Sequence, residues 1–329
     1  MAVSFSGGGV APGAWRVVRR LLWGLLALAV LWALYVAVRF HHAEHRLYAW
    51  LQGEPNVPAW HAQPGGLMLS GYRMDVVGRE LGGVKNLSGL AWDAQRGQLA
   101  AVLNRPATLL LLDREGRLQA RYRLHGFSDT EAVAALGDGW YAVTEEGREQ
   151  LAMFRVPAGG KSGEGMSGEI QHAQAVVLGL DLSPDDGGNA GFEGLAYDMA
   201  DDALFVAKEH SPTRLYEVHG LAALRGNGEL RGLSIRDRSD LLAPLRASDD
   251  LSSVEVDPRT HHLLLLSDEG QRVTELTRDG VPLGQRLLDG SVAGEPPLAQ
   301  AEGVAIDGDG TLYVVGEPNL FYRLRPAGG

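Results

Sequence analysis

The sequence contains no cysteine. Disulfide bonds, thiolate nucleophiles and zinc–thiolate sites are therefore excluded, and the compartment has to be inferred from other features. The chain also lacks an excess of basic residues, since 30 Lys and Arg stand against 41 Asp and Glu, for a net charge of −11. A nucleic-acid partner needs a basic face, so this balance argues against nucleic acid and suits small cations better.

Common catalytic motifs are missing as well. The chain has no G-x-S-x-G nucleophile elbow, no H-E-x-x-H zinc motif and no glycine-rich phosphate loop. Five histidines of the main domain are scattered without the spacing of metal ligands, and we expect surface or packing roles for them: His125, His172, His219, His261 and His262.

One long apolar run stands near the N-terminus. Residues 21–38, LLWGLLALAVLWALYVAV, carry no charge and reach the lower limit for a membrane-spanning helix. Arg16, Arg19 and Arg20 precede the run and Arg39 follows it, which favours a cytoplasmic N-terminus. The run therefore predicts a transmembrane signal anchor at 21–38, with residues 1–20 in the cytoplasm and the bulk of the chain outside.

Two alternatives exist for this run. A cleaved signal peptide usually has a shorter apolar region than one that includes Trp23, Trp32 and Tyr35. A buried core helix would not be flanked by arginines on both sides. Residues 39–66 then break into Pro and Gly, which is typical of a stalk.

Five segments of the remaining chain share one pattern. In each, a small or acidic residue opens a short apolar strand, a turn follows, and a second apolar strand ends on a polar or acidic residue. The segments begin at Leu87, Thr130, Phe192, Leu251 and Ala301, and their second positions are 43, 62, 59 and 50 residues apart. These intervals are typical of propeller blades. The pattern predicts an all-β domain at 67–329, a β-propeller with five blades, and the two longest intervals leave loop insertions or a sixth blade as alternatives.

The two ends of this domain are expected to meet. Only 27 residues follow Glu302, which is enough for three strands of a four-stranded blade. The fourth strand should come from residues 67–77, and this pairing would close the ring. Residues 157–169 and 183–191 are rich in Gly, Ser and Pro and are interpreted as inserted loops.

The acidic residues fall at recurrent places in the repeat. The first strand of each hairpin starts at one face of the ring and the second strand returns to that face, so the residues at their ends should converge on one mouth of the central channel. The predicted mouth pairs are Ser88 with Asn104, Glu131 with Glu146, Glu193 with Glu209, Ser252 with Glu269, and Glu302 with Glu317.

Six glutamates at one mouth repel one another. Two carboxylates about 6 Å apart repel by roughly 3 kcal/mol at an effective dielectric constant near 20. Protons, basic neighbours or a bound cation must reduce this repulsion, and the basic candidates are Arg105, Arg148, Lys208 and His210. The oxygen ligands favour calcium, then magnesium, as a divalent cation. The alternative is a solvated acidic rim without a ligand.

Four stretches of the chain resemble the SdiA-regulated family, the YjiK/CarP-type β-propeller proteins. They are NLSGLAWD, GFEGLAYD, KEHSPTRLYEV and AEGVAIDGDGTLYVVGEPNLFYRL, and the resemblance spans about residues 67–326. It implies a propeller anchored in the inner membrane by a single span and facing the periplasm, with an association with calcium, and it implies no particular reaction.

Two functions follow from these observations. The first is a binding or signalling module whose acidic mouth holds a cation and a small-molecule ligand, or whose loops recruit a periplasmic protein. The second is a calcium-dependent hydrolase of a phosphoester or lactone, in which the metal activates water and Glu209, beside Lys208 and His210, is the candidate base.

Overall fold

The computed structural model describes residues 12–41, 51, 62–157, 168–180, 191–209, 212–228, 232–245, 249–298 and 300–327. The chain divides into two compact units, Met1–Gly53 and Glu54–Gly329. His210, residues 183–190 and most of the predicted stalk lie outside the described residues.

The first unit contains a single long helix, α1 (Pro12–His41). Its segment Val18–Tyr35 is long and apolar enough to cross a membrane, and a signal sequence at this place would have the same character. The apolar run predicted at 21–38 is therefore helical throughout, and it is either a signal sequence or an anchor.

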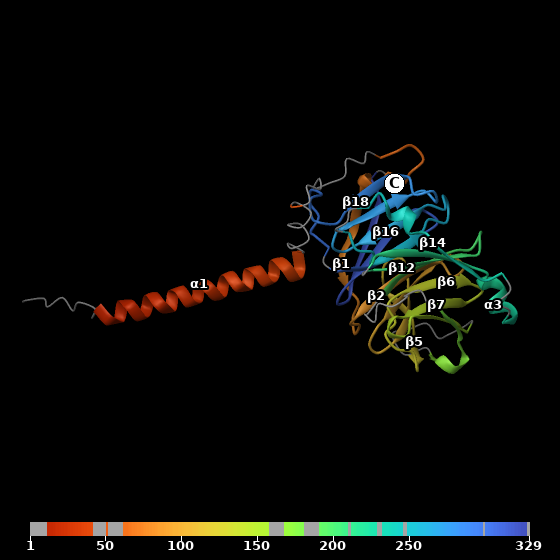
Figure 1. Ribbon diagram of the computed structural model, residues 1–329, viewed down its shortest axis with the longest axis horizontal. Coiled ribbons are helices and arrows are strands. Elements are labelled where there is room, and N and C mark those ends of the chain that lie inside the picture. The colour runs from red at the N-terminus through yellow and green to blue at the C-terminus, as the bar shows by residue number, and fades with distance from the viewer. Residues whose placement is uncertain are drawn as a thin grey trace, which may run out of the picture. The chain divides into compact units, whose positions relative to one another are not determined.

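The second unit is a five-bladed β-propeller (Figure 1). The innermost strands of the blades are β2 (Leu87–Asp93), β6 (Val133–Gly137), β11 (Phe192–Asp198), β15 (Ser253–Val256) and β19 (Ala301–Ile306). The second strands are β3 (Gln98–Leu103), β7 (Trp140–Glu145), β12 (Ala203–Lys208), β16 (Leu263–Ser267) and β20 (Leu312–Gly316). The third strands are β4 (Thr108–Leu112), β8 (Gln150–Arg155), β13 (Arg214–His219), β17 (Arg272–Leu276) and β21 (Leu320–Pro326). The fourth strands are β5 (Leu118–His125), β10 (Val176–Gly179), β14 (Ser234–Asp237), β18 (Pro282–Leu287) and β1 (Tyr72–Glu80).

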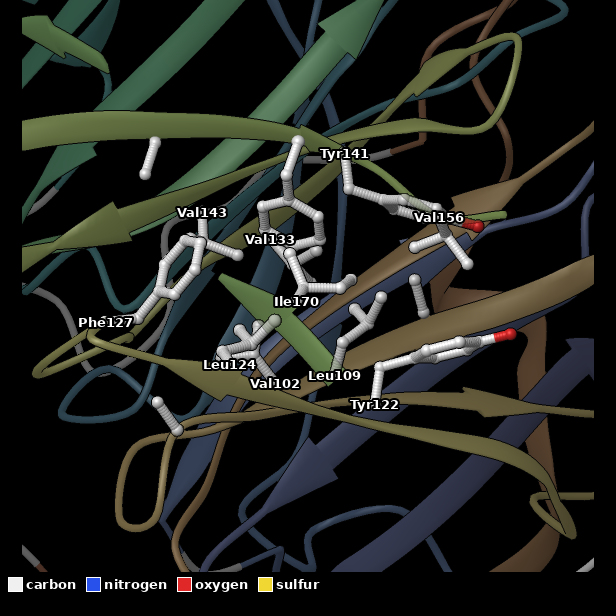
Figure 2. Packing of buried hydrophobic residues seen from close by; sticks show 14 of the residues in the cluster. Val102, Leu109, Tyr122, Leu124, Phe127, Val133, Tyr141, Val143, Val156 and Ile170 are labelled. Atoms are coloured by element: carbon white, nitrogen blue, oxygen red, sulfur yellow. The ribbon is translucent and has the colours of Figure 1, made fainter. Parts of the chain in front are cut away.

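The prediction of five blades is confirmed, and the five sheets close into a ring. One apolar core lies between each pair of neighbouring blades, including the last and the first. Figure 2 shows the core between the first two blades, where side chains such as Leu109 and Tyr122 point toward Val133 and Tyr141. Because both faces of each sheet are covered, the inner strands are apolar on both faces and do not alternate with polar residues.

The ring is closed by strand pairing between the two ends of the domain. β1 pairs antiparallel with β21, so that Tyr72 lies opposite Pro326 and Glu80 opposite Leu320. In Figure 1, β1 in orange lies beside the blue C-terminal strands. The predicted closing strand at 67–77 is thus confirmed in kind, although it begins later, because Leu69–Gly71 forms the 3₁₀ turn η1.

One predicted loop contains regular structure. The insert at 157–169 ends in the strand β9 (Gly168–Gln171), which pairs in parallel with β5 and adds a fifth strand to the first blade. Its side chain Ile170 packs into the core of Figure 2. The remaining short elements are η2 (Glu146–Arg148), η3 (His172–Gln174), α3 (Leu221–Asn227) and η4 (Ser239–Leu242).

Three inner strands carry glycine at the third position of the repeat because the blades approach closely there. A Cβ atom added at Gly303 would lie 2.7 Å from the backbone N of Leu90 in the next blade, and one at Gly89 would lie 2.8 Å from the backbone O of Glu131. Gly194 faces Val254 in the same way. Such distances are far below van der Waals contact, so neighbouring inner strands are packed backbone against backbone.

The substitution Gly303→Ala is expected to destabilise the protein by about 1–3 kcal/mol, because the added methyl group overpacks this contact. The measurement is urea unfolding of the full-length protein in detergent, followed by tryptophan fluorescence. Gly284→Ala in β18 is the matched control, since a Cβ there meets no atom within 4 Å. Equal stability of the two variants would contradict the close packing of the inner strands.

Candidate metal-binding site at the channel mouth

The hairpins bring the predicted mouth residues to one end of the ring. In four blades the residue after the second strand donates a backbone hydrogen bond to the residue two places before the repeat's second position. These bonds join Asn104 to Asn86 (3.1 Å), Glu146 to Asp129 (3.0 Å), Glu209 to Gly191 (2.9 Å) and Glu317 to Gln300 (3.0 Å). In the remaining blade the N–H of Glu269 donates to the Asp250 carboxylate at 3.0 Å.

Three carboxylates of the second blade form a tight group. One oxygen from each of Asp129, Glu131 and Glu146 lies within 4.8 Å of the other two. Asp129 has a left-handed backbone with φ of 52°, which turns it toward the mouth just before the inner strand. This acidic triad, Asp129, Glu131 and Glu146, could hold a metal ion.

Glu131 is the most buried member of the acidic triad, with 9% of its surface exposed. Its pKa is raised to about 7, chiefly by burial and then by the negative charges of Glu146, Asp129 and Glu317, and a hydrogen bond from Ser88 opposes the rise. The Asn104 side-chain amide also donates to Glu131. The other end of that amide is unsatisfied, because Asn104 Oδ1 is buried and has no hydrogen-bond donor among the described residues.

Glu146, the second glutamate of the acidic triad, lies near Arg105 of the first blade. The pKa of Glu146 is raised by burial and by the charge of Asp129, and Arg105 opposes the rise. Arg105 Nη2 lies 2.8 Å from Asp129 Oδ1, but its side chain is largely exposed to solvent. The arginine therefore neutralises only part of the negative charge of the acidic triad.

Two further glutamates are partly buried, Glu193 in β11 and Glu302 in β19. The pKa of Glu193 is raised well above its usual value by burial and then by the charges of Glu131 and Glu209. The pKa of Glu302 is raised in the same way by burial and by Asp268 and Glu317. Carboxylates on different blades thus act on one another, which requires them to face one opening.

The third and fourth blades add acidic groups of their own. Burial and, after it, the charges of Asp250, Glu269 and Asp268 together raise the pKa of Glu209 to about 8. Asp250 is itself buried and has a pKa of about 6, although the Ser267 hydroxyl donates to it. Glu269 lies next to Asp250 through the backbone bond described above.

Several predicted residues lie elsewhere or have other partners. Ser252 is almost fully buried, and its hydroxyl donates to the backbone O of Leu266 at 3.4 Å; Asp250, two residues earlier, is a further acid of the same blade. Arg148 pairs with Glu145 at 2.8 Å. Lys208 is buried at the end of β12.

Three aspartates were missed by the sequence reasoning: Asp129, Asp250 and Asp268. A signal for two of them exists, since Asp129 and Asp250 both stand two residues before the repeat's second position. Asp268 directly precedes a predicted mouth residue, Glu269. Strand register places only the residues at the strand ends, and these three aspartates belong to the turns beside them.

Five histidines among the described residues of the propeller contact acidic side chains. His172, His261 and His262 lie 2.7 to 2.8 Å from Glu145, Asp198 and Glu275. His125 and His219 lie 3.1 and 3.4 Å from Glu169 and Glu217. None belongs to the acidic triad, which agrees with the packing and surface roles expected for them.

Comparison with solved structures finds propellers of unlike sequence. A luciferin-regenerating enzyme is 15% identical with a TM-score of 0.47, and the match covers 77% of this chain and 96% of that one. A gluconolactonase from Xanthomonas campestris is 15% identical with a TM-score of 0.45, over 81% of this chain and 95% of that one. A virginiamycin B lyase from Staphylococcus aureus is 10% identical with a TM-score of 0.42, over 74% and 68%.

The family comparison covers most of the chain. The SdiA-regulated family matches residues 65–325, which include β1 and β21 and therefore the complete ring. The same match contains all the predicted mouth residues, from Ser88 to Glu317. This protein belongs to the SdiA-regulated family.

Proposed function

We propose that the mouth binds a divalent cation, with calcium favoured over magnesium, and that the protein is a membrane-anchored periplasmic binding or signalling module. The observation that carries the proposal is the acidic triad, whose carboxylate oxygens lie within 4.8 Å of one another. Asn104 supports it, because its side-chain amide contacts Glu131 and its buried Oδ1 has no hydrogen-bond donor among the described residues, which leaves this oxygen available as a further ligand.

The ligand chemistry favours calcium. Carboxylate and amide oxygens are hard ligands, and the described mouth residues offer no sulfur. Calcium accepts six to eight oxygens in flexible geometry, whereas magnesium requires a near-ideal octahedron. Glu193 and Glu209 of the third blade and Glu302 of the fifth extend the acidic surface over two further blades. The negative field of this surface attracts a cation and holds it at the mouth.

A bound cation would lower the proton occupancy of the carboxyl groups at the mouth, and it would link the first and second blades. Glu131 and Glu146 come from the second blade, whereas Asn104 and Ser88 come from the first, so a shared cation would link the two. Its charge would also replace the protons that burial favours on these carboxyls. The charge and shape presented to a ligand or periplasmic partner would then depend on calcium, as a binding or signalling module requires.

The proposal is tested by isothermal titration of calcium into the full-length protein in detergent. We expect saturable binding that weakens at least tenfold in Glu131→Gln and in Glu146→Gln, because each change removes an ionised ligand without changing side-chain size. Glu80→Gln, an exposed acid of β1, is the matched control. Absence of saturable heat, or equal affinity in all three variants, would exclude a cation site at the acidic triad.

A second candidate function is calcium-dependent hydrolysis, and one observation favours it. Glu209 faces the same charged groups, and its pKa of about 8 is close to the value that suits proton transfer near neutrality. The calcium-loaded protein of the titration is therefore incubated with a phosphoester and with a lactone. Turnover that is lost in Glu209→Gln would assign a hydrolase, and its absence would leave the binding module.

The membrane arrangement is tested with introduced cysteines, which would be unique because the natural chain has none. Val281→Cys, at a position that is 53% exposed, is expected to react with a membrane-impermeant maleimide in intact spheroplasts. Ser6→Cys should react only after lysis. Loss of the Ser6→Cys label from the mature protein would show a cleaved signal sequence, and protection of Val281→Cys would place the propeller in the cytoplasm.

A further inference from the structure

The end of the channel opposite the acidic mouth contains a cavity of about 270 Å³. The inner strands start at the acidic mouth, and this cavity is lined by residues at their other ends, from all five blades. Each inner strand contributes residues from its C-terminal end to the cavity wall. Examples are Trp92 of β2, Gly137 of β6, Tyr197 of β11, Val256 of β15 and Ile306 of β19.

Most of the cavity wall is apolar. Trp92, Tyr197, Ile306 and Met199 line it. The ring of Trp92 is held in place by stacking on Tyr313, with 6.4 Å between the ring centroids. Met199 is 51% exposed, and its side chain covers Gly137. A concave, largely apolar pocket of this kind suits a small organic ligand.

One carboxyl group lies in this apolar wall. Glu255 lines the cavity and belongs to β15. It stands three residues after the second position of its repeat, Ser252. At the same place the other four inner strands carry alanine: Ala91, Ala134, Ala196 and Ala305. A carboxyl group therefore stands at this place in one blade of the five.

The Glu255 carboxyl spans the channel. It accepts a hydrogen bond from its neighbour Val256 at 2.8 Å, and further backbone N–H groups of Trp92 and Ile306 donate to it from two other blades. Burial nevertheless raises its pKa to about 8, because no opposite charge offsets the loss of water. Among the described residues, no Lys, Arg or His forms an ion pair with Glu255.

Four other acids at this end of the channel pair with arginine, and one of them, Asp198, also contacts His261 of the cavity wall at 2.8 Å. The four pairs are Asp93 with Arg96 (3.1 Å), Asp198 with Arg278 (3.2 Å), Asp257 with Arg259 (2.9 Å) and Asp307 with Arg114 (3.5 Å). These aspartates end or directly follow inner strands, and they also accept the backbone N–H groups of the turns. The ion pairs fasten the hairpins, and they leave Glu255 as the acid without a cationic partner in the cavity wall.

We propose that this cavity binds a small organic ammonium ion. The cationic head would lie against Glu255 and supply the missing positive charge, and the apolar body would contact Trp92, Tyr197 and Ile306. Aromatic faces attract cations as well as apolar groups, so the wall is suited to both parts of such a ligand. The site is independent of the acidic triad, which lies at the opposite end of the channel.

The proposal is tested by isothermal titration of the full-length protein in detergent with n-butylammonium and phenethylammonium, in the presence of EDTA. The comparison probes are 1-butanol, which lacks the charge, and butyrate, which carries the opposite one. We expect saturable 1:1 binding of the ammonium ions, at least tenfold tighter than that of 1-butanol, and no binding of butyrate. Chelation of calcium should leave this binding unchanged, which separates it from the acidic mouth.

Three variants locate the site. Glu255→Gln keeps the size of the side chain and is expected to weaken ammonium binding at least tenfold, whereas Glu80→Gln, on the exposed outer strand, leaves it unchanged. Met199→Lys places a tethered ammonium over the cavity from an exposed position, so it should block binding without disturbing the fold. Absence of saturable binding, equal affinity for 1-butanol, or full binding by Met199→Lys would overturn the proposal.

Discussion

Raising the pH from 5 to 8 in the presence of a chelator is expected to destabilise the propeller, and added calcium is expected to restore its stability at pH 8. Burial raises the pKa of Glu131 to about 7 and that of Glu209 to about 8. In the unfolded chain these carboxyls ionise near their usual value of about 4.3. Between these limits the folded state binds more protons than the unfolded state, so the free energy of unfolding falls as the pH rises.

The expected effect is large. A shift of the Glu131 pKa from 4.5 to about 7 corresponds to a loss on the order of 3 kcal/mol across the window. Glu193 and Glu302 act in the same direction, because their pKa values are also raised by burial. Calcium at about 100 times its dissociation constant would return roughly 2.7 kcal/mol.

Ion-paired carboxyls shape the acidic side of this profile. Burial alone would raise the pKa of Glu217, but the hydrogen bond from Arg238 and the charge of Arg278 outweigh it and lower the pKa. The stability that such a group contributes is present above its unfolded pKa and is lost as the pH falls through its folded pKa. Maximal stability without calcium is therefore expected near pH 5.

The measurement is urea unfolding of the full-length protein at pH 5, 6, 7 and 8, with EDTA and with calcium. The double variant Glu131→Gln/Glu209→Gln is the control: glutamine carries no charge at any of these pH values, so the fall in stability should become smaller, and Glu193 and Glu302 account for what remains. Stability that rises from pH 5 to pH 8 in EDTA would contradict the burial of these carboxyls.

Arg272→Met is expected to destabilise the protein by about 3–5 kcal/mol. Arg272 Nη2 lies 2.5 Å from Asp249 Oδ1, and the two side chains are 4% and 2% exposed. Methionine fills a similar volume but leaves Asp249 charged and buried beside Asp250. An unpaired buried charge is far more unfavourable than the loss of a surface ion pair.

An exposed arginine provides the comparison for this prediction. Arg117 is 65% exposed and lies 3.5 Å from Asp113 Oδ2, so Arg117→Met should change stability by less than about 1 kcal/mol. Adding Asp249→Asn to Arg272→Met should recover part of the loss, since it removes the stranded charge. A loss below about 1 kcal/mol in Arg272→Met, measured by urea unfolding, would show that the pair is solvated.

Much of the fold could be predicted because each blade is specified by local pattern. An apolar strand, a turn with Asp or Gly and a second apolar strand recur five times, and the strand that closes the ring follows from the three strands after Glu302. β9 could not be predicted in this way. Its parallel pairing with β5 depends on the path of an insertion between blades, and no local periodicity encodes that path.

The candidate site was predictable only where it depends on strand register. Glu131 and Glu146 flank one hairpin, so their convergence follows from antiparallel pairing alone. Asp129 completes the acidic triad through a left-handed turn before the strand. Asp250 is not part of the triad, and the loop that precedes β15 brings it to Glu269. Turn conformation of this kind depends on the neighbouring blade as much as on the residue, so these acids were not identified.

The sequence by itself determined the repeat, the number of hairpins and the end of each hairpin at which the acids stand, because these depend on residue spacing along one strand pair. Only the tertiary structure decided which acids lose water and which meet an arginine. Glu255 and the arginine-paired Asp257 are two residues apart, yet one lines the channel cavity and the other fastens a turn. That difference arises because Glu255 lies within the inner strand β15, where neighbouring blades remove it from water, whereas Asp257 follows the strand, where the turn brings Arg259 to it.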